Sequence, residues 1–302
     1  MTQTPDWIAV DWGTTRLRAW AMDAGDQVLA HAASEAGMAA TAPEGFEPAL
    51  LALIEPWLGA GRTRVIACGM VGARQGWVDA GYRAVPAQPL APPLAVAPVR
   101  DGRLDVRIVP GLSQQKPADV MRGEETQIAG LLSLRPGFDG VVCLPGTHTK
   151  WAEISAGEVV SFRSFMTGEM FAALATATVL RQSVAAEGWD EAAFTEAVSA
   201  AISRPERLAG ELFSIRAGAL LQGLGPEAAR ARLSGLLIGA ELAAARPWWL
   251  GRRIALVGDG GAGARYEAAL ADQGAPVERI GAGEVTLAGL GRARVLEADA
   301  TG

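Results

Sequence analysis

The sequence predicts an α/β protein of two lobes, each of which begins with a hairpin sheet. Its 302 residues correspond to about two domains at roughly 150 residues each. Two segments resemble each other: IAVDWGTT at Ile8–Thr15 and VVCLPGTH at Val141–His148. Each is an apolar run of strand character that ends in a Gly-Thr turn. With 50% hydrophobic and 20% charged residues, the chain is typical of compact globular proteins.

The similarity between the two segments continues beyond the Gly-Thr turns. In both halves, alternating polar and apolar residues follow the turn, then a small turn (DAGD or SAGE) and another strand-like run. Strand, Gly-Thr turn, strand, tight turn and strand therefore occur at the start of each half. Chance is the alternative explanation, because hairpins that contain glycine are common.

The remaining elements are predicted from composition and periodicity. A proline-rich run predicts extended surface chain, and the Ala- and Leu-rich stretch from about residue 169 to residue 250 predicts helices. The proline-rich run is Ala84–Val99. The other predicted strands are Val106–Gly111, Arg252–Val257 and Val277–Ile280, and the other predicted helices are Val120–Leu134, Ala262–Gln273 and a last helix beginning at Glu284–Gly291. We expect an N-terminal lobe at 1–134 and a C-terminal lobe at 135–302.

Composition excludes several classes of function. A net charge of −6 gives no general attraction to nucleic acid or to anionic membrane. Two cysteines and two histidines cannot form a four-ligand zinc site without carboxylates, and two cysteines fit a reducing cytosol. The opening MTQTPDW lacks the features of a signal peptide, and the apolar stretch from Leu233 is shorter than the ~20 residues of a membrane span. We expect a cytoplasmic protein with His31 on its surface.

The segment Asp11–Thr15 carries the strongest chemical signal. An acidic residue at the end of a buried strand needs a metal ion or hydrogen-bond donors as partners. Gly13 permits close approach of the backbone to a ligand, and Thr14 and Thr15 supply hydroxyls and amides for phosphate oxygens. The structural alternative is a β-turn whose aspartate caps its own loop. The second turn, Gly146-Thr147, favours a pair of phosphate loops that hold both ends of a polyphosphate.

Acidic and basic residues follow these turns. In MRGEET, Glu124 and Glu125 open a helix, where one carboxylate suits the helix dipole and the other a general base or the orientation of metal-bound water. His148 and Lys150 follow the second Gly-Thr turn, and we expect them to bind phosphate. A structural role is the alternative for such a histidine.

A glycine-rich segment follows the predicted strand near the C-terminus. Gly258, Gly260, Gly261 and Gly263 lie between that strand and a helix. The spacing also fits a dinucleotide-binding fingerprint, in which Glu278 would be the ribose-binding acid. Too few residues remain after Gly258 for such a domain, so we expect a loop of the second lobe that approaches a nucleotide.

Together these segments resemble the actin, sugar kinase and Hsp70 superfamily, and within it the 2-dehydro-3-deoxygalactonokinase family. The resemblance spans nearly the whole chain, through IAVDWGTTRLRAW, GMVGARQGW, VPGL, MRGEETQ, LPGTHTKW, FRSFMTGE, LSGLLIGAE and ARYEAAL. It implies a two-lobed actin-like ATPase (ribonuclease H-like) fold with duplicated lobes and a central nucleotide cleft.

The resemblance also implies a phosphotransferase with an alcohol acceptor. ATP and Mg²⁺ would be used to phosphorylate the 6-hydroxyl of 2-dehydro-3-deoxy-D-galactonate in galactonate catabolism. Asp11, Gly13, Thr14 and Thr15 match the first phosphate loop, Gly146 and Thr147 match the second, and Gly258–Gly263 occupy the adenosine-motif position. Asp11 would lie nearest the magnesium. The alternatives are another sugar acid such as 2-dehydro-3-deoxygluconate, a non-catalytic sugar sensor, or an NAD-linked dehydrogenase.

One departure concerns the base, since LPGTHTK lacks the aspartate that many related sugar kinases place there. Asp11, Glu124, Glu125 and Glu169 remain candidates, and phosphoryl transfer depends more on positioning than on a base. The acidic chain must hold a sugar-acid carboxylate with local cations, for which arginine is well suited. The candidates for substrate binding are Arg18, Arg74, Trp77, Arg122, Arg163 and Glu169. Exposed salt bridges, or core packing for Trp77, are the structural alternatives. The Ala-rich helices could pack internally or form a homodimer face.

Overall fold

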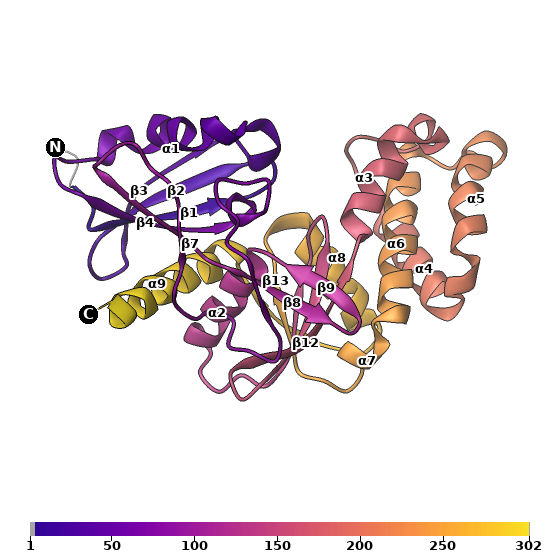
Figure 1. The fold of residues 1–302 in the computed structure, drawn as a ribbon. Helices are drawn as coiled ribbons and strands as arrows, with labels where there is room; N and C mark the ends of the chain where they lie inside the picture. The colour runs from indigo at the N-terminus through magenta and orange to yellow at the C-terminus, as the bar shows by residue number, and fades with distance from the viewer. Residues whose placement is uncertain (1–3, 302) are drawn as a thin grey trace. The chain divides into compact units, whose positions relative to one another are not determined.

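The computed structural model describes residues 4–301, which form two compact units (Figure 1). The first unit comprises the chain up to Asp139, the segment Ile154–Ser161 and the chain from Gly281 onward. The second comprises Gly140–Glu153 and Phe162–Ile280. The expected division at residues 134 and 135 therefore differs from the observed one, chiefly because the last helix joins the first unit. The first three residues of MTQTPDW lie outside the described chain.

A six-stranded sheet forms the centre of the first unit, in the order β3-β2-β1-β4-β7-β6. Its strands are β1 (Trp7–Trp12), β2 (Leu17–Met22), β3 (Val28–Ser34), β4 (Thr63–Gly69), β6 (Ala95–Val96) and β7 (Leu104–Ile108). The first three are paired antiparallel, whereas β1, β4 and β7 are parallel. The parallel strands bring the ends of β1 and β4 to the same edge, where Asp11 lies opposite Cys68.

Side chains of this sheet alternate between two helical layers. Ile8, Val10 and Trp12 face α1 (Phe46–Ile54), which buries Phe46 and Leu50 against them. Trp7 and Ala9 face the opposite layer, formed by α2 (Glu124–Leu134) and α9 (Ala282–Thr301). Figure 1 shows α1 along one face of the sheet and α9 along the other. Asp11 belongs to the second series and therefore lies on the α2 and α9 face.

The last helix belongs to the first unit because it packs closely on α2. A side chain at Gly130 would overlap the backbone of Val285, and one at Gly289 would overlap that of Thr126. Small residues at these two positions let the helix backbones approach each other. The C-terminal segment is thereby fixed to the helix that begins with Glu124.

A small sheet in the order β5-β8-β9 corrects part of the predicted helix at Val120–Leu134. Its strands are β5 (Tyr82–Ala84), β8 (Gly111–Gln115) and β9 (Ala118–Met121). Val120 and Met121 are therefore in a strand, and α2 begins only after Gly123, which has a φ of 102°. The predicted strand at Val106–Gly111 is divided between β7 and β8. Pairing with β8 outweighs the local helical periodicity.

The proline-rich run at Ala84–Val99 was predicted to lie on the surface, and this was wrong for part of it. Leu90 and Leu94 are buried in the core beneath α9. The Leu94 N–H donates to the buried carboxylate of Glu297 at 2.9 Å. Proline disfavours regular structure but does not prevent an extended segment from packing over a sheet.

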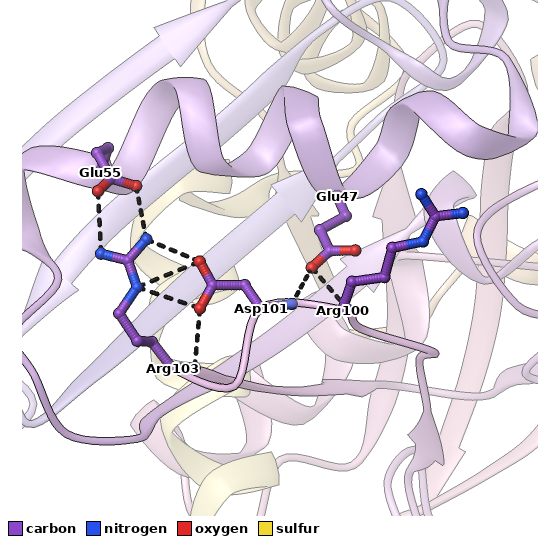
Figure 2. A network of polar contacts seen from close by, with 5 residues as sticks. All are labelled: Glu47, Glu55, Arg100, Asp101 and Arg103. Carbon is purple, nitrogen blue, oxygen red and sulfur yellow. Dashed lines mark hydrogen bonds and ion pairs between the residues drawn. The ribbon is translucent and has the colours of Figure 1, made fainter.

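Charged residues connect α1 to the turn before β7 (Figure 2). Arg103 donates to Glu55 at 2.9 Å and to Asp101 at 2.7 Å, while Glu47 accepts the backbone N–H groups of Arg100 and Asp101. Hydrogen bonding to Arg103 lowers the pKa of Asp101. Partly exposed pairs of this kind contribute little individually, and they fix the turn rather than the core.

The second unit repeats the arrangement of the first, as the sequence predicts. Its five-stranded sheet has the order β12-β11-β10-β13-β14, which corresponds to β3-β2-β1-β4-β7. The strands are β10 (Gly140–Leu144), β11 (Thr149–Ser155), β12 (Glu158–Phe165), β13 (Ile254–Val257) and β14 (Val277–Ile280). The end of β11 and the start of β12, within Ile154–Ser161, are grouped with the first unit. Both parallel pairings, β10 with β13 and β13 with β14, are present. The duplicated α/β fold is therefore confirmed.

Helices fill the interval between β12 and β13, as expected from composition. They are α3 (Thr167–Ala177), α4 (Glu191–Ser203), α5 (Leu208–Leu221), α6 (Pro226–Ala244) and α7 (Arg246–Trp249), with α8 (Gly260–Asp272) after β13. Residues of α4, α6 and α8 bury Cys143 and Trp151 of the sheet. Among the described residues, no helix has both the length and the apolar character needed to cross a membrane.

Candidate functional site

The loop after β1 presents its hydroxyl groups to solvent. The Gly13 N–H donates to Arg16 O at 2.9 Å, which closes the turn, and the loop is supported by Met38 N–H to Gly13 O at 3.0 Å. Thr14 and Thr15 are exposed, and their hydroxyls have no protein partner within residues 4–301. The loop is therefore fixed through its backbone while its side-chain donors are available to an anion.

The carboxylate of Asp11 does not accept hydrogen bonds from this loop. The alternative of a β-turn capped by its own aspartate is therefore not observed. Its Oδ2 accepts a hydrogen bond from Arg18 Nη2, on the neighbouring strand. Its Oδ1 lies 4.0 Å from the Sγ of Cys68. Burial raises the pKa of the Cys68 thiol, and the charges of Asp11 and Glu125 raise it further. Asp11 thus has one oxygen held by Arg18 and one directed along the sheet edge.

The two glutamates at the start of α2 lie near Asp11 but have different surroundings. Two glycines show how close the start of α2 is to Asp11. A Cβ atom at Gly123, just before α2, would contact Gly69, and a Cβ atom at Gly69 would lie 3.5 Å from Asp11 Oδ1. Glu125 is fully buried and accepts hydrogen bonds from Gly123 N–H at 2.7 Å and Thr126 Oγ1 at 3.0 Å. Glu124 is partly exposed and accepts from Arg122 N–H at 3.0 Å. Only Glu124 combines this position with access to solvent.

Burial makes Glu125 a source of pH-dependent stability. Desolvation, followed by the charge of Glu124, raises the pKa of Glu125 to about 7 from the ordinary value of 4.5. The folded protein therefore keeps a proton that the unfolded chain loses between these values. Stability then falls as pH rises through this window, by roughly 3 kcal/mol in total, and is constant above it.

Replacing Glu125 with glutamine removes this titration while preserving shape. We expect the stability of Glu125→Gln relative to the native protein to increase by roughly 3 kcal/mol between pH 5 and pH 8. Urea unfolding at several pH values measures the difference. If the free energies of unfolding of the two proteins changed in parallel with pH, Glu125 would not be the source of the pH dependence.

The surroundings of Asp11 suit a magnesium ion bound through water by one carboxylate, and not an ion enclosed by several protein ligands. Within residues 4–301, no group of three or more His, Cys, Asp or Glu side chains could enclose a metal ion. Mg²⁺ usually keeps several waters and is bound through one or two carboxylates together with substrate phosphates. The Oδ1 atom of Asp11 suits this form of binding, through water.

The second Gly-Thr loop is held by the start of α3. Glu169 N–H donates to Thr147 O at 2.9 Å, and Gly168 packs so closely on Gly146 that a side chain there would overlap its carbonyl. His148 Nε2 and Glu169 Oε2 are 2.6 Å apart, with both side chains 48% exposed. Lys150 is buried, and its Nζ donates to His148 O at 3.1 Å. Gly146 and Thr147 are exposed, so the loop can receive an anion.

The glycine-rich segment begins α8 and is held by an arginine. Arg279 donates to Gly258 O at 3.3 Å and to Gly260 O at 3.2 Å, and it also contacts Glu267 at 3.1 Å. Gly263 lies against Gly258, where a side chain would come within 3.0 Å of the carbonyl. The segment is therefore a tight loop at a helix N-terminus, an arrangement that suits anionic or polar ligands.

A pocket with a cavity volume of about 90 Å³ lies between the two loops of the second unit. It is lined by Pro145, Gly146, Thr167, Gly168, Phe171, Ser234, Leu237, Ile238, Ala262, Arg265 and Tyr266. Its walls combine apolar side chains with a few polar groups, as is typical of small-molecule sites. Arg265 lies over the ring of Trp189 at 4.1 Å, and burial lowers the pKa of Arg265.

Comparison with known proteins identifies the family. The family model described as 2-keto-3-deoxy-galactonokinase matches residues 11–293. The chain belongs to this family. A Rhizobium meliloti (strain 1021) protein named as a probable 2-dehydro-3-deoxygalactonokinase is 41% identical over 97% of this chain and 98% of its own. The Escherichia coli (strain K12) 2-dehydro-3-deoxygalactonokinase is 35% identical over 95% of this chain and 97% of its own.

A solved structure supports both family and fold. A Sinorhizobium meliloti crystal structure that carries the 2-dehydro-3-deoxygalactonokinase name matches with a TM-score of 0.89 and 41% identity. The match covers 95% of each chain. The two-lobed α/β fold predicted from the duplicated segments is confirmed. Residues 11–293, which the family model matches, include every predicted site residue.

The four arginines predicted to bind the substrate have different surroundings. Arg18 is bonded to Asp11, and Arg122 stacks on the ring of Tyr82 at 4.3 Å and donates to Gly81 O at 3.0 Å. The Nε and Nη1 atoms of Arg122 are buried and have no acceptor among the described residues. Arg74 and Arg163 are exposed, without a partner in residues 4–301, and Arg163 belongs to the second unit. Arg74 and Arg122 are thus two cations of the first unit that lack a carboxylate partner among the described residues.

Trp77 and Glu169 occupy places that the sequence did not indicate. The Trp77 ring stacks on Phe46 at 6.3 Å and its Nε1 donates to Pro98 O at 3.0 Å, on the α1 side of the sheet. Asp11 lies on the opposite face. Glu169 is bonded to His148. The core-packing alternative therefore describes Trp77, whereas Glu169 lies against the second Gly-Thr loop.

Sequence reasoning missed several residues around the second-unit pocket. They are Thr167, Phe171, Glu241, Arg265, Tyr266 and Arg279. Arg279 has no local signal, since one arginine in a short strand is ordinary. Glu241 has one, because a single acidic residue interrupts the apolar stretch LSGLLIGAELAAA. Such a carboxylate in a buried helix needs partners.

Proposed function

We propose that the chain is an ATP- and Mg²⁺-dependent kinase that phosphorylates the 6-hydroxyl of 2-dehydro-3-deoxy-D-galactonate. The observation that carries this proposal is the pair of exposed Gly-Thr loops, one at the start of each duplicated sheet. Their amides and hydroxyls suit phosphate oxygens. Membership of the galactonokinase family supplies the substrate class.

The second unit holds ATP in this proposal. The adenosine occupies the pocket beside the glycine-rich loop, between Phe171 and Arg265, while Gly146 and Thr147 bind phosphate oxygens. His148 and Lys150 add donors beside the same loop. Asp11 would hold Mg²⁺ through water, and the ion would supply charge neutralisation for phosphate oxygens.

Glu124 acts as the general base. A base must reach the hydroxyl that it deprotonates, and the complete burial of Glu125 prevents this contact. During transfer the 6-oxygen forms a bond to the γ-phosphorus as the bond from that phosphorus to the β,γ-bridging oxygen of ATP breaks. The hydroxyl proton passes to Glu124, and ADP leaves with the bridging oxygen.

Arg74 and Arg122 bind the sugar-acid carboxylate. Each is a cation of the first unit that lacks a carboxylate partner among the described residues. Arginine can bond a carboxylate through two parallel N–H groups, which orients as well as attracts it. A net charge of −6 makes such local cations necessary for an anionic substrate.

A coupled assay of ADP release with Mg²⁺ tests the function, with the galactonate compound beside its gluconate epimer. ADP release that depends on 2-dehydro-3-deoxygalactonate is expected. A strong preference for 2-dehydro-3-deoxygluconate would keep the chemistry and change the substrate. ADP release with neither compound, from a preparation shown to be folded, would refute the proposed kinase activity.

A further inference from the structure

Glu241 of α6 lies inside the second unit, directly behind the pocket assigned to adenosine. It is 3% exposed, and its carboxylate receives three hydrogen bonds. Trp151 Nε1 donates at 2.8 Å, Tyr266 OH donates at 2.6 Å, and the Thr167 hydroxyl is the third donor. Two of these donors, Thr167 and Tyr266, also line the pocket.

A carboxylate in this position costs stability that an apolar residue would not. Burial raises the pKa of Glu241, and the hydrogen bonds from Thr167, Tyr266 and Trp151 lower it in part. All three donors are neutral, so no counter-ion compensates the charge through these bonds. Replacing buried ionic groups with apolar ones is often neutral or stabilising. Stability of the fold is therefore a weak explanation for the presence of a glutamate at position 241.

The three bonds connect the elements that carry both nucleotide loops. Thr167 opens α3, and the next two residues hold the Gly146–His148 loop. Tyr266 lies on α8, whose first turn is the glycine-rich loop. Thr149, at the end of the Gly146–His148 loop, bonds the Tyr266 hydroxyl at 2.9 Å. Trp151 continues the same strand.

We infer that Glu241 is a positioning residue for the nucleotide, which fixes the second phosphate loop and the glycine-rich loop relative to each other through Thr167 and Tyr266. This inference rests on the proposed function, because it concerns the pocket assigned to ATP. Glu241 touches no substrate atom. Its effect is on the spacing of the walls between which the adenosine and the phosphates bind.

The test compares Glu241→Gln with the native protein in steady-state kinetics and in ATP binding by calorimetry without sugar acid. The glutamine keeps the size of the side chain but places an NH₂ group against the N–H and O–H donors. Residues that orient the ligands of a metal site typically change affinity or activity by roughly 10- to 100-fold when replaced, and the same range is taken as the expectation for Glu241. We expect KM and Kd for ATP to rise by at least about tenfold, with less than about a twofold change in KM for the sugar acid.

A second variant and a double mutant keep the test independent of folding. Tyr266→Phe removes only the hydroxyl and keeps the buried ring, and it should weaken ATP binding in the same direction. If both act through one network, the combined variant Glu241→Gln/Tyr266→Phe should lose less than the sum of the single losses.

Glu297→Gln provides the matched control. Glu297 is also a buried carboxylate, at 2% exposure, but it lies in α9 of the first unit and accepts the Leu94 N–H. It should lower stability without changing KM for ATP. An unchanged ATP Kd in both Glu241→Gln and Tyr266→Phe would overturn the inference, as would equal shifts in Glu297→Gln. Absence of ATP binding by the native protein would instead refute the proposed function.

Discussion

Replacing Asp11 with asparagine is expected to lower kcat by roughly 10²- to 10³-fold, with little change in KM for the sugar acid. Asparagine still accepts the hydrogen bond from Arg18, so the edge of the sheet keeps its shape. It loses the negative charge that would hold hydrated Mg²⁺ in the proposed function. Initial rates at increasing Mg²⁺ concentrations, with saturating ATP and sugar acid, measure the effect.

Asp105→Asn is a suitable control for Asp11→Asn. Asp105 is 6% exposed in β7 of the same sheet, and it bonds Arg64 at 2.7 Å and Arg107 at 3.0 Å. Its loss should lower the free energy of unfolding and leave kcat of the folded protein unchanged. A near-native kcat in Asp11→Asn would remove Asp11 from the mechanism.

Replacing Glu124 with glutamine is expected to lower kcat by roughly 10²- to 10⁴-fold, the usual contribution of a general base. The partial exposure of Glu124 lets it reach a substrate hydroxyl, and glutamine keeps an oxygen to accept the Arg122 N–H. KM for ATP should change little, because the nucleotide is held by the second unit in the proposal. Single-turnover measurements of phosphoryl transfer distinguish this loss from slow product release.

The neighbouring carboxylates test whether this assignment is specific. Glu125→Gln should mainly change the pH dependence of the free energy of unfolding. Glu169→Gln should mainly act through His148 and the second Gly-Thr loop. A loss of kcat confined to Glu125→Gln, with Glu124→Gln near native, would contradict the proposed base. It would imply that the start of α2 rearranges when the substrates bind.

The sequence predicts the repeated framework well because the determining interactions are local. An apolar strand, a Gly-Thr turn and a second strand are specified by neighbouring residues, and both copies form as predicted. The helical block and the glycine-rich loop are similarly local. The prediction for Val120 and Met121 was wrong because their pairing partners in β8 lie several residues away along the chain.

The candidate site was predicted in part, and the missing part depends on packing. By residue type and position in the chain, Glu124 and Glu125 were equivalent candidates, whereas the fold buries Glu125 and leaves Glu124 partly exposed. Arg18 suited a substrate carboxylate equally well by residue type, but strand register places it opposite Asp11. Trp77 lies on the other face of the sheet because it packs on Phe46.

The sequence by itself therefore determined the duplicated α/β framework, the two Gly-Thr loops and the galactonokinase family. Only the tertiary structure decided which carboxylate can reach a substrate, which arginines lack partners and what surrounds Glu241. The physical reason is that turns and strands arise from interactions between neighbours in the chain. Exposure, counter-ions and hydrogen-bond partners depend instead on residues that are distant in sequence and meet only in the folded protein.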